Sequence, residues 1–346
     1  MAGVVVTGAA GHLGGCLVRT LRARGQQVRA LVHRDRRALE GLDVEVIAGD
    51  IMDEESLRHA FSGADIVYHT AAYISISMGE HQRLHEINVV GTRNIVEACL
   101  HCGVKRLVHF SSIEVLECEP LSEPVDESRP LVQSQSALPY AGSKAAGERQ
   151  VRQGMARGLD AVILYPTAMI GPYDYRQGFP NAGLRAICEG RLWALVEGGF
   201  DWVDVRDVSK GAVHAAERAP AGARYILSGH WASLHDLAVL AREITGAPVP
   251  RLVCPMGLAR VGAPFVTAAC HLLGRQPLYT SAALVPLAGN ENISHARATH
   301  ELGYQPRPLR RTVVDTMQWF ESMGVSARQF PLTAAGGQLV DSPGGE

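Results

Sequence analysis

The chain has 346 residues, of which 47% are hydrophobic and 20% charged, and its formal net charge is −2. This composition is ordinary for a globular protein, and a charge so close to zero gives no electrostatic support for a nucleic-acid or membrane-surface partner. The length allows one large α/β domain, or a domain with a smaller lobe. The first 20 residues lack the basic segment and apolar core of a signal peptide, so we expect a cytoplasmic protein.

The chain begins with a predicted strand, a glycine-rich turn and a helix. The β-branched run 4–7 precedes Gly8, Gly11 and Gly14, spaced G-x-x-G-x-x-G, and apolar residues then recur at helical spacing. Glycine lets a backbone approach a phosphate closely, and the free N–H groups of a helix N-terminus bind it. An ordinary strand–helix turn would look similar, but the preceding strand, the following helix and the later motifs favour a dinucleotide site.

Further strands alternate with helices over the first half of the chain. We expect strands at 28–32, 44–48, 66–69 and 107–110, a long helix over 82–102 and another beginning at Pro139. This alternation predicts an α/β fold of the Rossmann type, a doubly wound parallel sheet with right-handed crossovers. Ligands bind such sheets at the carboxyl ends of the strands, where Gly8, Asp50, Ala71 and Ser112 fall.

The residues after the second strand bear on the choice of cofactor. The stretch 33–37 is His33-Arg34-Asp35-Arg36-Arg37. In a dinucleotide fold an acid at this strand tip favours NAD, whereas arginine accommodates the 2′-phosphate of NADP. The tip itself has no carboxylate, so the arginines favour NADP(H). Asp35 counts against that preference, and a solvated basic loop is the alternative. Asp50, after the third strand, is placed to reach the adenine amino group.

Ser112, Tyr140 and Lys144 form the predicted catalytic group. Tyr140 and Lys144 are four residues apart and share one face of a helix. The pKa of a phenol is about 10, so we expect the lysine ammonium to lower it for acid–base work near neutral pH. Tyr140 would then exchange a proton with a substrate oxygen that Ser112 holds, in preference to Ser111. Lys144 would also bind the nicotinamide ribose.

Together these motifs resemble the extended short-chain dehydrogenase/reductase family, from residue 2 to about 323. The matching positions are Thr7-Gly8-x-x-Gly11-x-x-Gly14, Asp50, Ala71-Ala72, Asn88-x-x-Gly91-Thr92, Ser111-Ser112, Tyr140-x-x-x-Lys144, Tyr165-Pro166-Thr167 with Gly171-Pro172, and 203–208. Within the family, 111–115 is similar to 3β-hydroxysteroid dehydrogenases, and the 166–172 and 204–208 region to bacterial dihydroflavonol 4-reductase-like proteins.

The resemblance implies a cofactor site, a homodimer and no metal. The dimer would form through a four-helix bundle of the helices over 82–102 and 140–155. The implied cofactor contacts are Gly8, Gly11, His12, Leu13, Gly14, His33, Arg34, Asp50, Ile51, Ala71, Ala72, Lys144, Tyr165, Pro166 and Thr167.

Past residue 170 the alternation fades, and we expect the chain to build a substrate lobe. The predicted division is a dinucleotide-binding domain over 1–170, a lobe over 171–330 with some segments returning to the sheet, and a disordered tail over 331–346. The segment 117–136 is either a substrate-side flap or disordered surface. We expect each aromatic residue of 173–202 to belong to the core and not to contact a ligand, although these residues lie where the family binds substrate. We expect the apolar stretch 252–273 to be an amphipathic lobe helix that covers an apolar pocket, with no membrane span. Peripheral membrane contact of this stretch is the alternative. We expect 309–323 to be a surface helix.

The seven cysteines give no evidence for a metal or redox site, and the intact catalytic group favours an enzyme. Cys99 and Cys102 have C-x-x-C spacing, which occurs in redox and zinc sites, but no second ligand pair is evident and two thiols on a helix are expected. The predicted function is an NAD(P)(H)-dependent oxidoreductase that interconverts a ketone and a secondary alcohol on an apolar, ring-containing substrate. The alternatives are a nucleotide-sugar epimerase or dehydratase, for which Arg176, Arg185 and Arg191 could bind a diphosphate, and a non-catalytic dinucleotide sensor.

Overall fold

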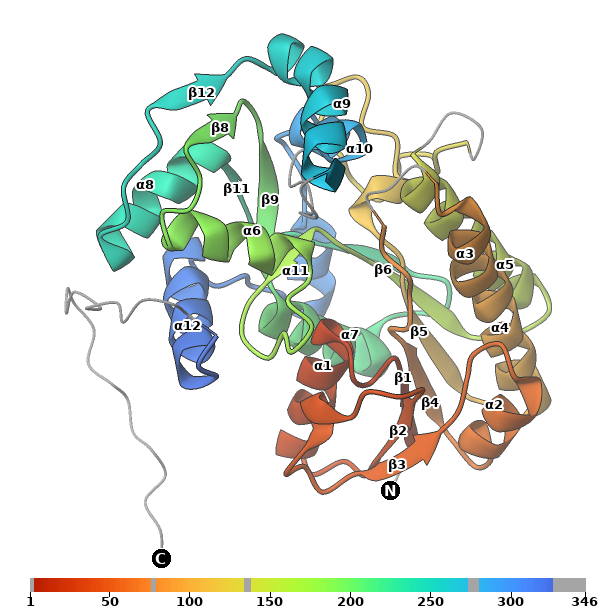
Figure 1. The fold of residues 1–346 in the computed structure, drawn as a ribbon. Helices are drawn as coiled ribbons and strands as arrows, with labels where there is room; N and C mark the ends of the chain where they lie inside the picture. Colours follow the sequence, from red (N-terminus) through yellow and green to blue (C-terminus); the bar gives the residue numbers. More distant parts are fainter. Residues whose placement is uncertain (1–2, 76–78, 134–137, 273–279, 326–346) are drawn as a thin grey trace, which may run out of the picture.

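The computed structural model describes residues 3–75, 79–133, 138–272 and 280–325, and its centre is a seven-stranded parallel sheet (Figure 1). The strand order is β10-β6-β5-β4-β1-β2-β3, so the direction of winding reverses between β1 and β4. Binding crevices of doubly wound folds form at such a reversal. The strands are β1 (Val4–Thr7), β2 (Val28–Val32), β3 (Glu45–Ala48), β4 (Ile66–His69), β5 (Arg106–Phe110), β6 (Ala161–Pro166) and β10 (Arg224–Leu227). The Rossmann-type prediction is confirmed.

Helices cover both faces of this sheet. The helices α1 (His12–Ala23), α7 (Val205–Arg218) and α11 (Ala296–Leu302) lie on one face, and α2 (Glu54–Phe61), α4 (Gly91–His101) and α5 (Pro139–Ala156) lie on the other. Val4, Val5 and Val6 are at most 1% exposed. A strand covered on both faces has no solvent side, which explains why the run is continuously apolar and does not alternate with polar residues.

The predicted helix over 82–102 is confirmed with one difference. It consists of α3 (His81–His85), a π-helical segment η2 (Glu86–Val90) and α4, which follow one another directly. Such π-helical turns occur often at functional sites. Two short 3₁₀ turns, η1 (Arg37–Leu39) and η3 (Ile113–Val115), follow β2 and β5.

The smaller C-terminal lobe is also present. It contains a three-stranded sheet in the order β11-β9-β7 and a pair formed by β12 and β8. Its strands are β7 (Ala168–Ile170), β8 (Ala194–Val196), β9 (Gly199–Asp204), β11 (His230–Ser233) and β12 (Leu252–Cys254), and its helices are α6 (Phe179–Cys188), α8 (Leu234–Thr245), α9 (Met256–Leu272), α10 (Ser281–Leu287) and α12 (Leu309–Ser322). The helix α7 and the strand β10 return to the main sheet, so the division at residue 170 stays a prediction.

One sequence-based expectation about this half of the chain needs correction, and another agrees with the structure. The stretch 252–273 is a strand, β12, followed by the helix α9, because Pro255 separates them. The aromatic side chains of 173–202 mostly pack on one another or on α12: Tyr175 meets Trp319 at 5.4 Å between ring centroids, and Phe200 meets Trp202 at 5.2 Å. The tail over 331–346 lies outside the described residues. Throughout the ranges that the structure describes, no helix combines the length and hydropathy that crossing a membrane would require.

The segment after η3 is held in place along most of its length. The guanidinium of Arg129 donates to the backbone carbonyls of Pro124 and Glu123, and the backbone N–H of Val125 donates to the carbonyl of Asn292 at 2.9 Å. The carboxylate of Glu127 accepts the backbone N–H of Ile226 in β10. Residues 117–133 are therefore an ordered connection between the main sheet and the lobe, and 134–137 lie outside the described residues.

Candidate active site

The glycine turn between β1 and α1 is shaped for close approach. Gly8 has φ +66°, a conformation that L side chains rarely adopt, and a Cβ there would stand 2.6 Å from the backbone nitrogen of Ala71. The helix α1 begins at His12 with Gly11 as its N-cap, and no side chain caps it. The first N–H groups of α1, including those of His12 and Leu13, are thus available to an anion at the positive end of the helix dipole.

The imidazole of His12 itself is used elsewhere. Its Nε2 donates to the carbonyl oxygen of Pro172, 3.0 Å away and 160 residues further along the chain. Burial lowers the pKa of His12, so the ring is a neutral donor. Of the predicted contacts, His12 and the buried Leu13 can offer the cofactor their backbone N–H groups only.

A cavity of about 690 Å³ runs along the carboxyl ends of the strands beside this turn. Its lining contains seven of the fifteen predicted cofactor residues, and Arg34 and Lys144 are not among them. The seven are Gly8, Gly11, His33, Asp50, Ile51, Ala71 and Ala72, and Arg176 lines the cavity in addition. Gly14 lies inside α1, where a Cβ would stand 2.2 Å from the carbonyl oxygen of Gly8, so it allows the turn to pack on the helix. The uncapped helix, the glycine turn and the size of the cavity fit a dinucleotide.

The side chains after β2 are arranged around Asp35. Its carboxylate accepts hydrogen bonds from Arg37 at 2.9 and 3.0 Å and lies 3.6 Å from Arg176, and the bonds from Arg37 lower the pKa of Asp35 to about 2. Arg34 and Arg36 are exposed and are not drawn into these pairs. Arg176 is a site residue that the sequence did not place here, because the loop that carries it is distant in the sequence.

The three predicted catalytic residues do come together. Ser112 follows β5 and caps η3, and its hydroxyl is hydrogen-bonded to that of Tyr140 on the first turn of α5. Lys144, one turn further along, is buried, and its ammonium donates to the carbonyl oxygen of Phe110 at 2.6 Å. Ser111 is turned away and donates to Glu148 at 2.7 Å. Ser112 is therefore the serine that faces Tyr140.

The expected lowering of the Tyr140 pKa is wrong for this structure. Burial is the largest influence and raises the pKa of the phenol, Glu114 raises it further, and the hydrogen bond with Ser112 only partly opposes them. Burial also lowers the pKa of Lys144, to about 8. The ammonium is directed at the Phe110 carbonyl and does not feature among the influences on Tyr140.

Two acidic residues that the sequence did not single out complete the surroundings. Burial raises the pKa of Glu114 to about 7, and its carboxyl faces Tyr140 closely enough to disfavour the phenolate. Glu148, on α5, is fully buried and accepts from Ser111, from the Tyr165 hydroxyl at 2.8 Å and from Arg152. Its charge raises the pKa of Lys144 against the effect of burial.

The predicted cofactor segment at the end of β6 does not line the 690 Å³ cavity. Tyr165 is fully buried with its hydroxyl on Glu148, and the Thr167 hydroxyl donates to Asp201 at 2.6 Å. These side chains and Pro166 do not line the 690 Å³ cavity, so their role toward a cofactor stays a prediction. Within the described ranges, no group of three or more metal-ligating side chains occurs, and Cys99 and Cys102 lie on α4 and its C-cap.

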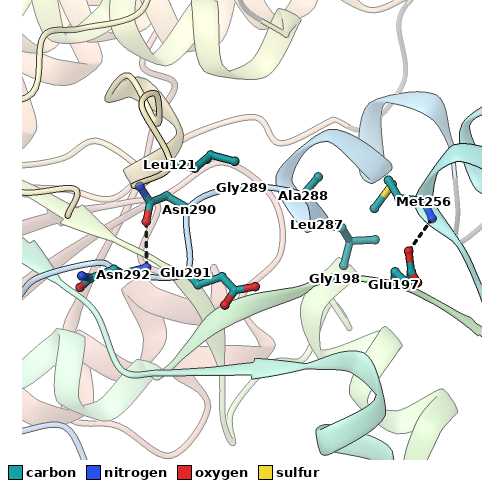
Figure 2. A pocket seen from close by; sticks show the side chains of 10 residues that line it. All are labelled: Leu121, Glu197, Gly198, Met256, Leu287, Ala288, Gly289, Asn290, Glu291 and Asn292. Atoms are coloured by element: carbon teal, nitrogen blue, oxygen red, sulfur yellow. Dashed lines mark hydrogen bonds between the residues drawn. The ribbon is translucent and has the colours of Figure 1, made fainter. Parts of the chain in front are cut away.

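A second cavity, of about 500 Å³, lies between the 117–133 segment and the lobe. Figure 2 shows Leu121 on one side and Leu287 and Met256 on the other, with Asn290 hydrogen-bonded to the backbone of Asn292. The lining includes the carboxylates of Glu197 and Glu291 and no lysine or arginine.

A cavity that fits a dinucleotide, with a serine, a tyrosine and a lysine at the same sheet edge, is the arrangement of an NAD(P)-dependent enzyme of the extended short-chain dehydrogenase/reductase class. Residues 4–227 match the model of the NAD-dependent epimerase/dehydratase family, and the chain belongs to this family.

Three relatives illustrate the range of the family. The chain is 35% identical to "Sterol demethylase protein B" of Methylococcus capsulatus, over 93% of this chain and 99% of that protein. It is 30% identical to a "Putative dihydroflavonol 4-reductase" of Synechocystis, over 92% and 94%. Among solved structures, a nucleoside-diphosphate-sugar epimerase from Pseudomonas aeruginosa superposes with a TM-score of 0.77 at 25% identity, over 94% and 99%.

Proposed function

We propose that the protein interconverts a ketone and a secondary alcohol on an apolar, ring-containing substrate, with NADP(H) as the cofactor and Tyr140 as the acid–base group. The observation that carries this proposal is the hydrogen-bonded pair of Ser112 and Tyr140, one helical turn from Lys144 and at the same sheet edge as the dinucleotide cavity.

The roles of the residues follow from their protonation. The raised pKa of Tyr140 keeps it a phenol at neutral pH, and a charged Glu114 reinforces this, so Tyr140 can donate its hydroxyl proton to a ketone oxygen. Ser112 hydrogen-bonds the same oxygen and polarises the carbonyl. The carbonyl carbon would receive its hydride from a nicotinamide when one is bound, or give it up in the reverse direction. Lys144, whose ammonium is held by the Phe110 carbonyl, would bind the nicotinamide ribose.

The substrate class is inferred from charges. A sugar nucleotide needs cationic groups for its diphosphate. The 500 Å³ cavity of the lobe, whose lining does not include the catalytic residues, presents two carboxylates. Of the arginines considered for this role, Arg185 and Arg191 pair with Glu189, and Arg176 lies at the cofactor cavity. Two relatives, a sterol demethylase protein and a putative dihydroflavonol reductase, are named for substrates with apolar ring systems, which supports this substrate class.

The preference for NADP(H) rests on the loop after β2. Because Arg37 and Arg176 occupy the Asp35 carboxylate, it is a poor acceptor for ribose hydroxyls, while Arg34 and Arg36 carry uncommitted charge. The double substitution Arg34→Ala/Arg36→Ala should weaken NADPH binding about tenfold or more and NADH binding little. Titration of each cofactor by fluorescence measures this, and equal losses would mean that the loop is merely solvated.

Three further features belong to the proposal. A homodimer would form through α4 and α5, which pack side by side on one face of the sheet (Figure 1). The catalytic part would extend to residue 170 and the substrate lobe would follow. Described cysteines are free thiols, which fits a cytoplasmic protein.

The first experiment is an absorbance assay of the purified protein with NADPH or NADH against ring ketones, hydroxysteroids and nucleotide sugars. Net oxidation or reduction with a ring ketone or alcohol is the expected result. Conversion of a nucleotide sugar without net absorbance change would instead assign the protein to the epimerases.

Tyr140→Phe removes the proton donor and leaves the ring in place. We expect turnover to fall by about 10²-fold or more, with cofactor affinity nearly unchanged. The matched control is Tyr304→Phe, which also removes a buried hydroxyl, one bonded to the Ser228 carbonyl at 2.9 Å. Substantial turnover by Tyr140→Phe would refute the assignment.

A further inference from the structure

The helix α9 exposes its large apolar side chains to solvent and buries small ones. It packs on the lobe core with small residues, Ala259 and Ala263, at 9% and 3% exposure. Leu258, Val261 and Phe265 form a stripe at spacings of three and four, and are 67%, 69% and 75% exposed. A helix at the surface of a globular protein shows the opposite arrangement.

The neighbouring elements extend this surface. The strand β12 leads directly into α9, and its Leu252 and Val253 are 52% and 36% exposed. Leu252 is in register with Ala194 of β8, so Trp193, at 82% exposure, lies at the same end of the strand pair. In Figure 1, β12, α9 and α10 lie along the edge of the molecule opposite the N-terminus. Single exposed apolar residues are normal, but a continuous group marks an interaction surface.

The charge of this region points to the partner. The chain has 35 acidic residues among 346, yet none lies between Ile244 and Asn290, while Arg251 and Arg260 are exposed beside the apolar stripe. The near-zero net charge of the whole chain conceals this local excess of positive charge. The nearby Glu197 accepts the backbone N–H of Met256 at the start of α9.

We propose that α9, with β12 and Trp193, docks on the surface of a lipid bilayer that contains anionic headgroups. An apolar stripe flanked by arginines is the arrangement of an interfacial helix, whose side chains enter the headgroup region while its cations meet lipid phosphates. A second copy of this chain is a poorer occupant, because a two-fold interface would place each basic patch against itself. The inference does not depend on the proposed reaction.

The position of α9 would connect a docked bilayer with the 500 Å³ cavity. Met256, its first residue, lines the 500 Å³ cavity together with Leu287 of α10 (Figure 2). A lipophilic molecule leaving the bilayer along α9 would therefore meet this cavity first.

The test is flotation of the full-length protein with vesicles of phosphatidylcholine alone or mixed with phosphatidylglycerol. We expect binding to the anionic vesicles that weakens with added salt. Val261→Gln/Phe265→Gln should lower the partition coefficient about tenfold or more, while the matched control Val239→Gln/Met323→Gln, which changes two exposed apolar residues on α8 and after α12, should bind as the wild type does. Arg251→Gln/Arg260→Gln should lower the preference for anionic vesicles.

Several outcomes would overturn the proposal. These are an absence of wild-type binding to either vesicle, equal binding by the patch and control variants, or a dimer in sedimentation that the patch variant dissociates. Circular dichroism and NADPH titration of each variant show whether it is folded. If the Val261→Gln/Phe265→Gln variant does not fold, the Arg251→Gln/Arg260→Gln variant still tests the surface.

Discussion

Glu148 connects the parts of the active site that do not touch the substrate. One carboxylate accepts hydrogen bonds from Ser111, Tyr165 and Arg152, on a strand end, the next strand and its own helix. It also supplies the negative charge that keeps the pKa of the buried Lys144 from falling further. Glu148 is thus a positioning residue: it acts through Lys144 and the strand ends.

The substitution Glu148→Gln should therefore change the pH profile. Lys144 acts as an ammonium, so activity falls as the pH rises through its pKa, about 8 in the free protein. Removing the charge of Glu148 lowers that pKa, and the alkaline fall of kcat/KM should move to lower pH. Rate measurements across pH check this.

Glu97→Gln is the control, because it neutralises a carboxylate in a surface pair with Arg157. Its pH profile should match that of the wild type. A Glu148→Gln enzyme that is slower at every pH by one constant factor would show a structural role only.

At the scale of elements, the contact between α5 and the π-helical segment η2 sets the site. Gly147 faces η2 so closely that a Cβ would stand 2.2 Å from the carbonyl oxygen of Asn88. The Asn88 side chain accepts the backbone N–H of Tyr73 at 2.8 Å and donates to the Ser143 hydroxyl at 2.9 Å. One close approach thus fixes both the loop after β4 and the helix that carries Tyr140.

Gly147→Ala should push these elements apart. We expect overpacking to cost about 1–3 kcal/mol of unfolding free energy, more than the roughly 1 kcal/mol that alanine contributes to a helix. Cofactor affinity should fall as well, because the loop after β4 lines the cavity. Thermal unfolding and NADPH titration measure both effects.

Gly183→Ala on α6 is the matched control, since a Cβ there meets nothing within 4 Å. It should stabilise the protein slightly. If Gly147→Ala were equally stabilising, the close approach of the two helices would be disproved.

The strands, the glycine turn and the catalytic helix could be predicted because their signals are local: apolar runs, glycine spacing and residues four apart. The choice between Ser111 and Ser112 as the residue beside Tyr140 needs the packing of β5 against α5, which spacing does not give. The raised pKa of Tyr140 was missed for the same reason, since burial results from distant segments. The π-helical turn and the exposed apolar stripe of α9 depend on tertiary packing, which a local sequence pattern does not predict.

For the whole molecule, a chain of ion pairs joins the main sheet to the lobe. Arg307 donates to Asp207 of α7 at 2.7 Å, and Arg206 bridges Asp204 and Asp315 of α12. The pairs are mostly buried, so their partners depend on one another.

Arg307→Ala should remove the guanidinium from the buried Asp207, leave it only the backbone N–H of residue 307, and cost about 3 kcal/mol of unfolding free energy. Chemical denaturation measures this. Arg58→Ala, which breaks an exposed pair with Glu54, should cost less than about 1 kcal/mol. Equal losses in the two variants would show that the ion pairs contribute little to holding the halves together.

The hydrogen bond from His12 to Pro172 has a thermodynamic consequence. His12 opens the helix whose first N–H groups face the pyrophosphate position, and its imidazole holds the segment that leads into the lobe. Cofactor binding that orders His12 also orders the segment at Pro172, because the hydrogen bond joins them. Reciprocity then requires that a substrate which orders the segment also tightens the cofactor by the same factor. The two ligands of this enzyme are thereby expected to bind cooperatively, with 160 residues of sequence between the partners of one hydrogen bond.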